Sequence, residues 1–265
     1  MIMRFLAAAA LILSSVPWSP AWAAAPECLA MAEGPGRALP AAYQPAAIAE
    51  DQVQLSYAGH STFIIESHQG IRIATDYAGY AGGIVPDVVT MNHAHNSHYT
   101  DFPDPAIKHV LRGWNPEGGA AQHDVQIGDV RIRNVTTDIR GGAYGRVPDG
   151  NSIFVFEVAG LCIGHLGHLH HELTPAHVGM IGRLDIVLVP VDGGYTMAQA
   201  AMLEVLKKLR ARIVIPMHFF GPATLARFIA NARPDFDIER SDTTIALLSQ
   251  ATLPERPKVL ALPGY

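Results

Sequence analysis

The 265-residue sequence has no excess of basic charge and no long run of like charge. Lysine and arginine number 19 against 24 aspartate and glutamate residues, which gives a formal net charge of −5. A nucleic-acid binder needs a basic face to neutralise phosphates. The composition therefore argues against a nucleic-acid partner. The absence of charged runs argues equally against a polyanionic partner or an anionic membrane surface.

Long apolar segments are also scarce. Only Phe5 to Val16 is continuously apolar apart from two serines, and it is shorter than the roughly 20 residues that a membrane-spanning helix needs. Arg4 precedes this segment, and Ala21-Trp22-Ala23 follows it with the small-x-small pattern that a signal peptidase reads. We therefore expect residues 1–23 to be a cleaved signal peptide that leaves no stable membrane anchor. The mature protein is then periplasmic or secreted.

Cysteine is nearly absent, because the chain has only Cys28 and Cys162. In an oxidising compartment these two residues can form a disulfide. The alternative is that Cys162 is a small buried strand residue and that Cys28 lies in a separate leader segment. The sequence leaves both interpretations open.

The rest of the chain is long enough for one large α/β domain. Residues 24–50 are rich in alanine and proline and are predicted to be a lead-in, followed by a single domain over residues 51–265. Short strands begin at Val53, and Gly128-Asp129 and Ala159-Gly160 are hairpin signals. Later strands alternate with helices, which indicates two sheets with helices packed outside. The predicted helices cover Pro105–Leu111, Pro175–Arg183, Thr196–Arg210 (from a capping-box pattern at Thr196-Met197-Ala198-Gln199) and Pro222–Ala232.

Histidine is abundant, with 13 residues. Three of them lie in the stretch His93-Ala94-His95-Asn96-Ser97-His98, directly behind the largely apolar run from Asp87 to Asn92. Imidazole nitrogen is the commonest neutral ligand for zinc and similar metals, so three rings at the end of one strand indicate a metal site. The alternative is a polar surface loop that happens to be rich in histidine.

Other short apolar runs end in the same way. Each is closed by a residue that can bind a metal or orient a ligand, and these residues are Asp76, His165 to His171, Asp192 and His218. Active sites of layered α/β proteins gather where loops from separate strand ends meet. The pattern therefore predicts that these side chains converge on one site, which scattered surface histidines would not do.

The motifs resemble those of the metallo-β-lactamase superfamily, and most closely those of its metal-dependent hydrolases similar to L-ascorbate-6-phosphate lactonase. The resemblance covers most of the chain after the leader. It implies an α/β fold, a four-layer αβ/βα sandwich of two mixed β-sheets with outer helices. The matching segments, in chain order, are Ala58–Phe63, Thr75-Asp76, Asp87–His98, His165–His171, Pro190–Thr196 and Pro216-Met217-His218.

Three positions depart from the motifs of that family. Ser97 replaces the aspartate of the H-x-H-x-D-H loop, and Thr136-Thr137-Asp138 stands where a third histidine is expected. His168 replaces the carboxylate that bridges two metals. Two dications ~3.5 Å apart repel by roughly 19 kcal/mol at an effective dielectric of about 20, which carboxylates normally offset. One metal ion is therefore favoured over two.

The resemblance, carried over residue by residue, assigns roles to the remaining groups. We expect one zinc ion, with iron or manganese as alternatives, bound by His93, His95 and His168 and with water in an open position. His218 is a further ligand, and His98 and His171 are the candidate catalytic groups that move protons. Four further residues are expected to orient a metal-binding histidine or to serve as additional metal ligands. They are Asp76, Asp192, His60 and Ser97.

Together these expectations describe an exported hydrolase in which zinc activates water. The bond cleaved in its small-molecule substrate is an ester, lactone, amide or phosphoester. A periplasmic binding protein whose chemistry has decayed is the main alternative, and redox chemistry at iron is another. Gly141 to Gly150 is either a loop over the pocket or a plain connector. The sequence leaves the substrate and the oligomeric state open.

Overall fold

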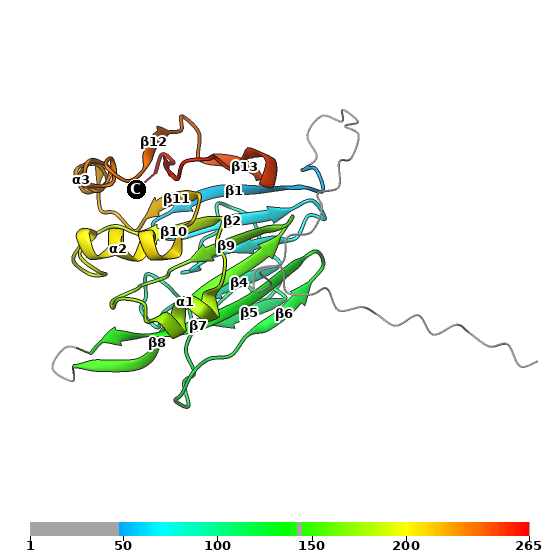
Figure 1. Ribbon diagram of the computed structural model, residues 1–265. Coiled ribbons are helices and arrows are strands. Elements are labelled where there is room, and N and C mark those ends of the chain that lie inside the picture. Colours follow the sequence, from blue (N-terminus) through cyan, green and yellow to red (C-terminus); the bar gives the residue numbers. More distant parts are fainter. Residues whose placement is uncertain (1–47, 142–144, 265) are drawn as a thin grey trace, which may run out of the picture.

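The fold consists of two mixed β-sheets packed face to face (Figure 1). The computed structural model describes residues 48–141 and 145–264. One sheet has six strands in the order β13-β1-β2-β3-β4-β5, and the other has eight in the order β12-β14-β11-β10-β9-β8-β7-β6. The predicted fold class is thereby confirmed. The predicted signal peptide and nearly all of the lead-in lie outside the described residues, so those domain limits stay predictions.

The six-stranded sheet is formed mainly by the first half of the domain. Its strands are β1 (Gln52–Gly59), β2 (Thr62–Ser67), β3 (Arg72–Ala74), β4 (Val88–Met91), β5 (His109–Arg112) and β13 (Ile245–Ser249). Strand β4 is buried on both faces, whereas β1 alternates between buried and partly exposed residues. Strands β3, β4 and β5 run parallel, so their carboxyl ends lie at the same edge of the sheet.

The eight-stranded sheet contains the long central hairpin of the molecule. Its strands are β6 (Asp124–Ile127), β7 (Val130–Arg140), β8 (Arg146–Val158), β9 (Leu161–His165), β10 (Ile186–Pro190), β11 (Ile213–Met217), β12 (Asp237–Arg240) and β14 (Lys258–Ala261). Turns at Gly128-Asp129 and Ala159-Gly160 join β6 to β7 and β8 to β9, as predicted. Of the segment Gly141 to Gly150, whose role the sequence left open, Arg146 to Gly150 belong to β8, and residues 142–144 lie outside the described residues.

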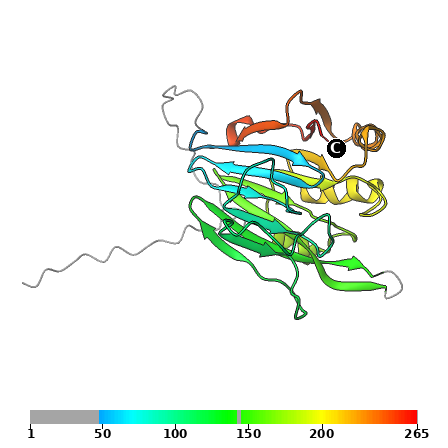
Figure 2. The same ribbon diagram turned by 180° about the vertical axis from the view of Figure 1, so that it is seen from behind.

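Three α-helices connect the parallel strands of this sheet. They are α1 (Pro175–Ile181), α2 (Gln199–Leu209) and α3 (Pro222–Ala232), and Gln250–Thr252 forms a short 3-10 helix. Helices α1 and α2 lie in front of the eight-stranded sheet in Figure 1 and behind it in Figure 2, away from the six-stranded sheet. In the described part of the chain, no helix is long and apolar enough to cross a membrane.

Two of the local predictions are wrong. The segment Pro105–Leu111 is not a helix, because His109 to Arg112 pairs with β4 and extends the parallel sheet as β5. The capping box at Thr196 does not form either. Helix α2 begins at Gln199 after Ala198, and the Thr196 hydroxyl instead donates a hydrogen bond to Asp192. In both places a tertiary partner overrides the local pattern.

The hydrophobic core fills the space between the sheets. Its largest fully buried side chains include Phe63 from the six-stranded sheet and Phe154 and Phe156 from the eight-stranded sheet. Cys162 is also fully buried, in β9. Its predicted partner Cys28 lies outside the described residues, so the Cys28–Cys162 disulfide stays a prediction. This packed core holds the strand ends of both sheets in fixed positions relative to one another.

Candidate metal centre

Loops from both sheets meet at one end of the sandwich, as the strand-end pattern predicted. The six-stranded sheet contributes His60 from the turn between β1 and β2, Asp76 after β3, and His93 to His98 after β4. The eight-stranded sheet contributes the segment after β9, Asp192 after β10, and His218 after β11. The site is therefore assembled from residues up to 158 positions apart in the chain, between His60 and His218.

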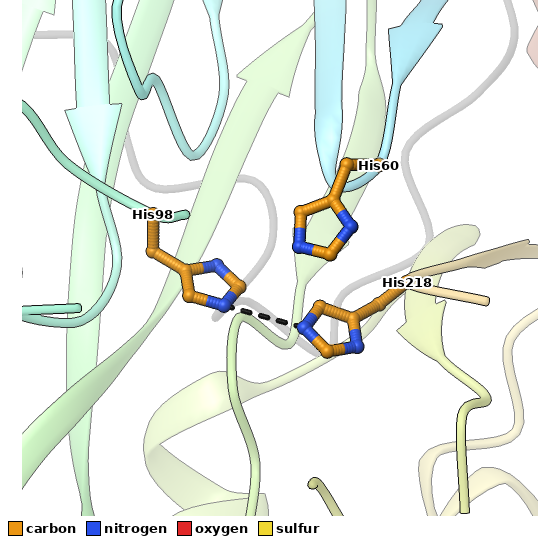
Figure 3. A group of neighbouring side chains, drawn as sticks. All are labelled: His60, His98 and His218. Carbon is orange, nitrogen blue, oxygen red and sulfur yellow. Dashed lines mark hydrogen bonds between the residues drawn. The ribbon is translucent and has the colours of Figure 1, made fainter. Parts of the chain in front are cut away.

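The tightest cluster in the described residues is formed by His60, His98 and His218. One ring nitrogen from each lies within 4.8 Å of the others. Figure 3 shows the three rings directed toward one another from separate loops. The rings of His98 and His218 are almost parallel, and their Nε2 atoms are 3.3 Å apart. Both side chains are almost fully buried.

A carboxylate fixes each of the two buried rings. Asp76 Oδ2 lies 2.5 Å from Nδ1 of His98, and Asp192 Oδ1 lies 3.0 Å from Nδ1 of His218. An ionised carboxylate only accepts, so each Nδ1 carries a proton, and in the neutral ring that binds a metal each Nε2 has a lone pair. Two lone pairs that face each other at 3.3 Å repel unless a cation or a proton lies between them. The arrangement matches metal-ligating histidines held by carboxylates.

The two carboxylates are held in the ionised form. Burial alone would raise the pKa of Asp76, but the charge and hydrogen bond of His98 outweigh it and bring the pKa to about 2. Burial likewise opposes ionisation of Asp192, whose pKa is nevertheless far below its usual range through hydrogen bonds from His218 and Thr196. Asp192 Oδ2 also accepts backbone N–H groups of Gly194 and Tyr195. Asp192 is therefore held in place by hydrogen bonds on both carboxylate oxygens.

The backbone at this centre adopts an uncommon conformation. The φ angles of His60, Asp76 and His218 are 52°, 49° and 52°, in the left-handed region that most side chains avoid. Such angles persist where the surrounding structure imposes them. Here the His218 N–H donates to the carbonyl of His60 at 2.8 Å, which links the two sheets. The Tyr57 hydroxyl donates to the same carbonyl. The turn that carries His60 is thus anchored directly to the loop that carries His218.

The donor set suits a borderline metal ion. Nε2 of His60 is buried and has no hydrogen-bond partner among the described residues, and it belongs to the cluster that faces His98 and His218. Burial, followed by the neighbouring His218 and His98, lowers the pKa of His60 to about 4, so the ring is neutral near pH 7. Three neutral imidazoles are the protein ligands of one class of catalytic zinc site. The residues therefore fit a metal ion.

The three ligands predicted from the sequence are arranged more loosely. Ring centroids of His93 and His95 are 6.2 Å apart, and those of His95 and His168 are 6.4 Å apart. Zinc–nitrogen bonds of ~2.0 Å would hold two ring centroids about 5 Å apart at a tetrahedral angle. Only the His93–His168 pair, at 5.3 Å, approaches that spacing. These three rings belong to the same site but do not form its tightest cluster. His93 and His95 are two residues apart in one turn, and their ring planes are nearly parallel.

Hydrogen bonds orient His93 and His95 toward the same space. Nδ1 of His93 donates to the carbonyl of Gly150 at 2.7 Å, which leaves its Nε2 lone pair free. Nδ1 of His95 lies 2.9 Å from the hydroxyl of Ser97, the residue that stands in the place of the expected aspartate. Burial is the main cause that lowers the pKa of His93. The Nε2 lone pair of His93 is therefore available in the cavity that both rings line.

The histidines form one wall of a cavity of about 580 Å³. Among the described residues no carboxylate lines it, and the lining residues Tyr195 and Phe220 are 68% and 62% exposed. Neither predicted proton-transfer residue is among its lining residues. His98 is fully buried with its Nδ1 bound to Asp76, and His171 packs beside His170 with a buried Nε2. The lining residues are His60, His93, His95, Ser97, Arg140, His168, His170, Gly194, Tyr195, His218 and Phe220.

Comparison with known proteins places these observations in a family. Residues 54–218 match the family model described as a β-lactamase superfamily domain. This chain belongs to the β-lactamase superfamily. The predicted resemblance is thus confirmed at the level of the superfamily, and the narrower lactonase-like group stays a prediction.

Similar proteins from the superfamily carry hydrolase names. A UPF0173 metal-dependent hydrolase of Opitutus terrae is 30% identical over 211 residues, which cover 68% of this chain and 92% of the relative. One from Salinibacter ruber is 25% identical over 198 residues, covering 63% of this chain and 84% of the relative. A crystal structure from Thermotoga maritima, classed as a zinc-dependent hydrolase of the metallo-β-lactamase superfamily, is 30% identical with a TM-score of 0.59. The match covers 80% of this chain and 100% of that one.

The superfamily motifs that this chain lacks are replaced by hydrogen-bonded residues. Thr137, at the place of the expected third histidine, is buried, and its hydroxyl accepts from the side-chain amide of Asn151 at 2.9 Å. The side-chain oxygen of Asn151 in turn accepts the backbone N–H of His168 at 2.7 Å. The departure at Thr137 is therefore part of a network that fixes the position of His168.

The sequence assigned no role to several residues that line the cavity, among them His170, Arg140 and Phe220. His170 was identified only as part of the histidine-rich strand end, and Arg140 was not identified at all. The Arg140 guanidinium reaches three backbone carbonyls, those of Gly194, Tyr195 and Thr196, through one nitrogen.

Proposed function

We propose that this protein is an exported metal-dependent hydrolase with one zinc ion held by His60, His98 and His218. The observation that carries the proposal is the convergence of three ring nitrogens within 4.8 Å, two of them fixed by buried carboxylates. The ligand set differs from the one expected from the motifs, since His60 joins it while the ring centroids of His93 and His95 lie 6.2 and 5.9 Å from that of His98.

The residues of this chain prepare the site in two ways. Asp76 and Asp192 hold the Nδ1 protons of His98 and His218, which keeps both Nε2 lone pairs directed at one point. The left-handed backbone at His60 brings the third ring over that point. A zinc ion bound there lowers the pKa of a water molecule and polarises a carbonyl or phosphoryl oxygen.

The cavity favours a small substrate with an electron-rich or anionic group. Its volume of about 580 Å³ falls in the range of small-molecule sites. Of the lining residues that the structure describes, Arg140 alone is permanently charged, and none of them is a carboxylate. An ester, lactone, amide or phosphoester with an attached anionic group fits this lining, while the aromatic rim of Tyr195 and Phe220 suits an apolar portion.

Two further supports come from outside the site. Relatives that match most of their own length to this chain are named metal-dependent hydrolases, which favours hydrolysis over redox chemistry. The segment of residues 1–23 has the charge, apolar core and small-residue pattern of a signal peptide, which supports export.

The test combines metal analysis with a substrate panel. We expect purified protein to contain one zinc ion per chain by mass spectrometry, and His218→Gln to contain far less. His109→Gln, at an exposed position in β5, is the matched control and retains the ion. Metal-stripped protein should lose hydrolysis of p-nitrophenyl acetate, γ-butyrolactone or bis(p-nitrophenyl) phosphate and regain it with zinc. Equal rates for stripped and loaded protein would contradict the proposal, as would a tightly bound second ion.

One observation favours a second candidate, a metal-binding protein without turnover. Within residues 48–141 and 145–264 no carboxylate that can act as a base lines the cavity, and Ser97 replaces the aspartate of the superfamily loop. Stoichiometric zinc together with no hydrolysis of any member of the panel would favour this candidate. If the purified protein contained iron in place of zinc, redox chemistry would be favoured over hydrolysis.

A further inference from the structure

A chain of hydrogen bonds runs behind the cavity wall from Arg140 to His168. The backbone N–H of Arg140 donates to Nδ1 of His170 at 2.7 Å. Nε2 of His170 then lies 2.7 Å from Nδ1 of His168. The His168 ring itself lines the cavity, with its centroid 4.7 Å from that of His98 and 5.0 Å from that of His218.

The first link fixes the proton of His170. A backbone N–H can only donate, so Nδ1 of His170 must present a lone pair. The single proton of that ring therefore lies on Nε2, because a ring without any N–H would be an imidazolate. That proton faces Nδ1 of His168, the atom 2.7 Å away, and the carbonyl of Tyr195 is a second acceptor beside the ring.

The second link then fixes the proton of His168. Since Nδ1 of His168 accepts, the proton of this ring is on Nε2. This is opposite to His98 and His218, whose Nδ1 atoms donate to Asp76 and Asp192. Among the described residues no protein atom forms a hydrogen bond with Nε2 of His168, and the ring borders the cavity.

We infer that His168 is a hydrogen-bond donor to the substrate and not a metal ligand. Its Nε2–H is available to the oxygen atom of the substrate that gains negative charge during hydrolysis. A neutral imidazole can act as such an electrophile, and a preorganised donor of this kind is an effective source of transition-state stabilisation. His170 is the positioning residue that keeps the donor proton on Nε2.

Metal ligation by Nε2 of His168 is incompatible with the chain of hydrogen bonds. A ligand nitrogen must have its lone pair free, so the proton would have to move to Nδ1. There it would meet the N–H of His170 at 2.7 Å, and relieving that contact would break the hydrogen bond to His170 or to Arg140. The position of the bridging carboxylate in the superfamily motif is thus occupied by a group of opposite hydrogen-bonding character.

The proton positions can be measured without any substrate. Long-range ¹H–¹⁵N correlation spectra of histidine-labelled full-length protein, metal-free and zinc-loaded, report which ring nitrogen carries the proton. We expect His168 and His170 to be protonated on Nε2, and zinc-loaded His98 and His218 to be protonated on Nδ1. His170→Phe removes the second link, and the His168 resonances should then show a share of the Nδ1–H form. A His168 ring protonated on Nδ1 in the unchanged protein would overturn the inference.

A pair of variants separates a donor from a ligand. Glutamine can place its amide N–H near the position of Nε2, whereas asparagine reaches only the position of Nδ1. We expect His168→Gln and His168→Asn to retain zinc at the level of the unchanged protein, unlike His218→Gln. We also expect His168→Asn to reduce kcat about 10²–10³-fold on the panel member hydrolysed fastest, and His168→Gln to lose less. Loss of zinc in both His168 variants would refute the inference.

The donor role rests on the proposed function, because a hydrolysed substrate supplies the oxygen that accepts the proton. The two proposals fail separately. If no panel substrate is hydrolysed but the ring is protonated on Nε2 and zinc survives both substitutions, only the proposed hydrolase activity fails. If hydrolysis is zinc-dependent and His168→Asn releases the ion, only the donor role fails.

Discussion

Replacing Asp76 by asparagine tests the most deeply buried electrostatic contact of the site. Asp76 is completely buried, accepts the Nδ1 proton of His98 and also accepts the backbone N–H of Asn92 at 3.1 Å. Asparagine has nearly the same shape and tolerates the left-handed φ of 49°. The substitution therefore removes charge and one acceptor while leaving the packing almost unchanged.

The expected size follows from the pKa of the carboxyl group. Folding lowers the pKa of Asp76 from its ordinary 3.8 to about 2, against the opposing effect of burial, through its contacts with His98. That difference corresponds to about 2 kcal/mol in the free energy of unfolding of metal-free protein near pH 7. A lowered folded-state pKa stabilises above pH ~4, and the contribution is lost as the pH falls through about 2. The variant should thus approach the unchanged protein only at strongly acidic pH.

Zinc affinity is the more specific measure. Removing a residue that orients a metal-binding histidine typically costs 10–100-fold in metal affinity. We expect a loss of this size for Asp76→Asn in competition titrations with a chromogenic chelator, and urea unfolding of chelated protein gives the stability change. Asp87→Asn is the matched control, since Asp87 accepts from Arg72 and Lys108 away from the site. Equal zinc affinities for Asp76→Asn and Asp87→Asn would refute the claim that Asp76 positions His98.

Three further predictions concern the framework and the metal. Gly167→Ala should lower the free energy of unfolding by about 1–3 kcal/mol in urea. The new Cβ would lie 2.5 Å from Asn151 Oδ1 and 2.7 Å from Asn92 Cβ, at a φ of +59°. An unchanged urea midpoint would contradict this packing. Arg133→Met should cost about 3–5 kcal/mol, since Arg133 is buried against Glu157 and two carbonyls at the end of α1; a loss below 1 kcal/mol would show that the pair is dispensable. Zinc at 100 times its Kd should stabilise the folded state by about 2.7 kcal/mol. The melting temperature should then be higher with zinc than with a chelator. An unchanged melting temperature would show that the ion does not bind or binds the unfolded chain equally well.

Much of the fold was predictable from the sequence, because its signals are local. Alternating apolar residues and two-residue turns at Gly128-Asp129 and Ala159-Gly160 specify hairpins without reference to distant residues. The predictions failed where a distant partner decided the outcome. His109 to Arg112 became a strand because β4 offered a free edge, and Thr196 was drawn from its capping position to the carboxylate of Asp192.

The sequence by itself determined which residues stand at strand ends, and so which side chains gather at the site. It did not determine which atom each presents, because that depends on partners far along the chain. Asp76 and His98 are 22 residues apart, and His98 and His218 are 120 apart. A ring nitrogen becomes a lone pair or a donor according to what its other nitrogen contacts. Only the tertiary structure therefore decided that His60 lies with His98 and His218 while His168 is hydrogen-bonded to His170 at the cavity wall.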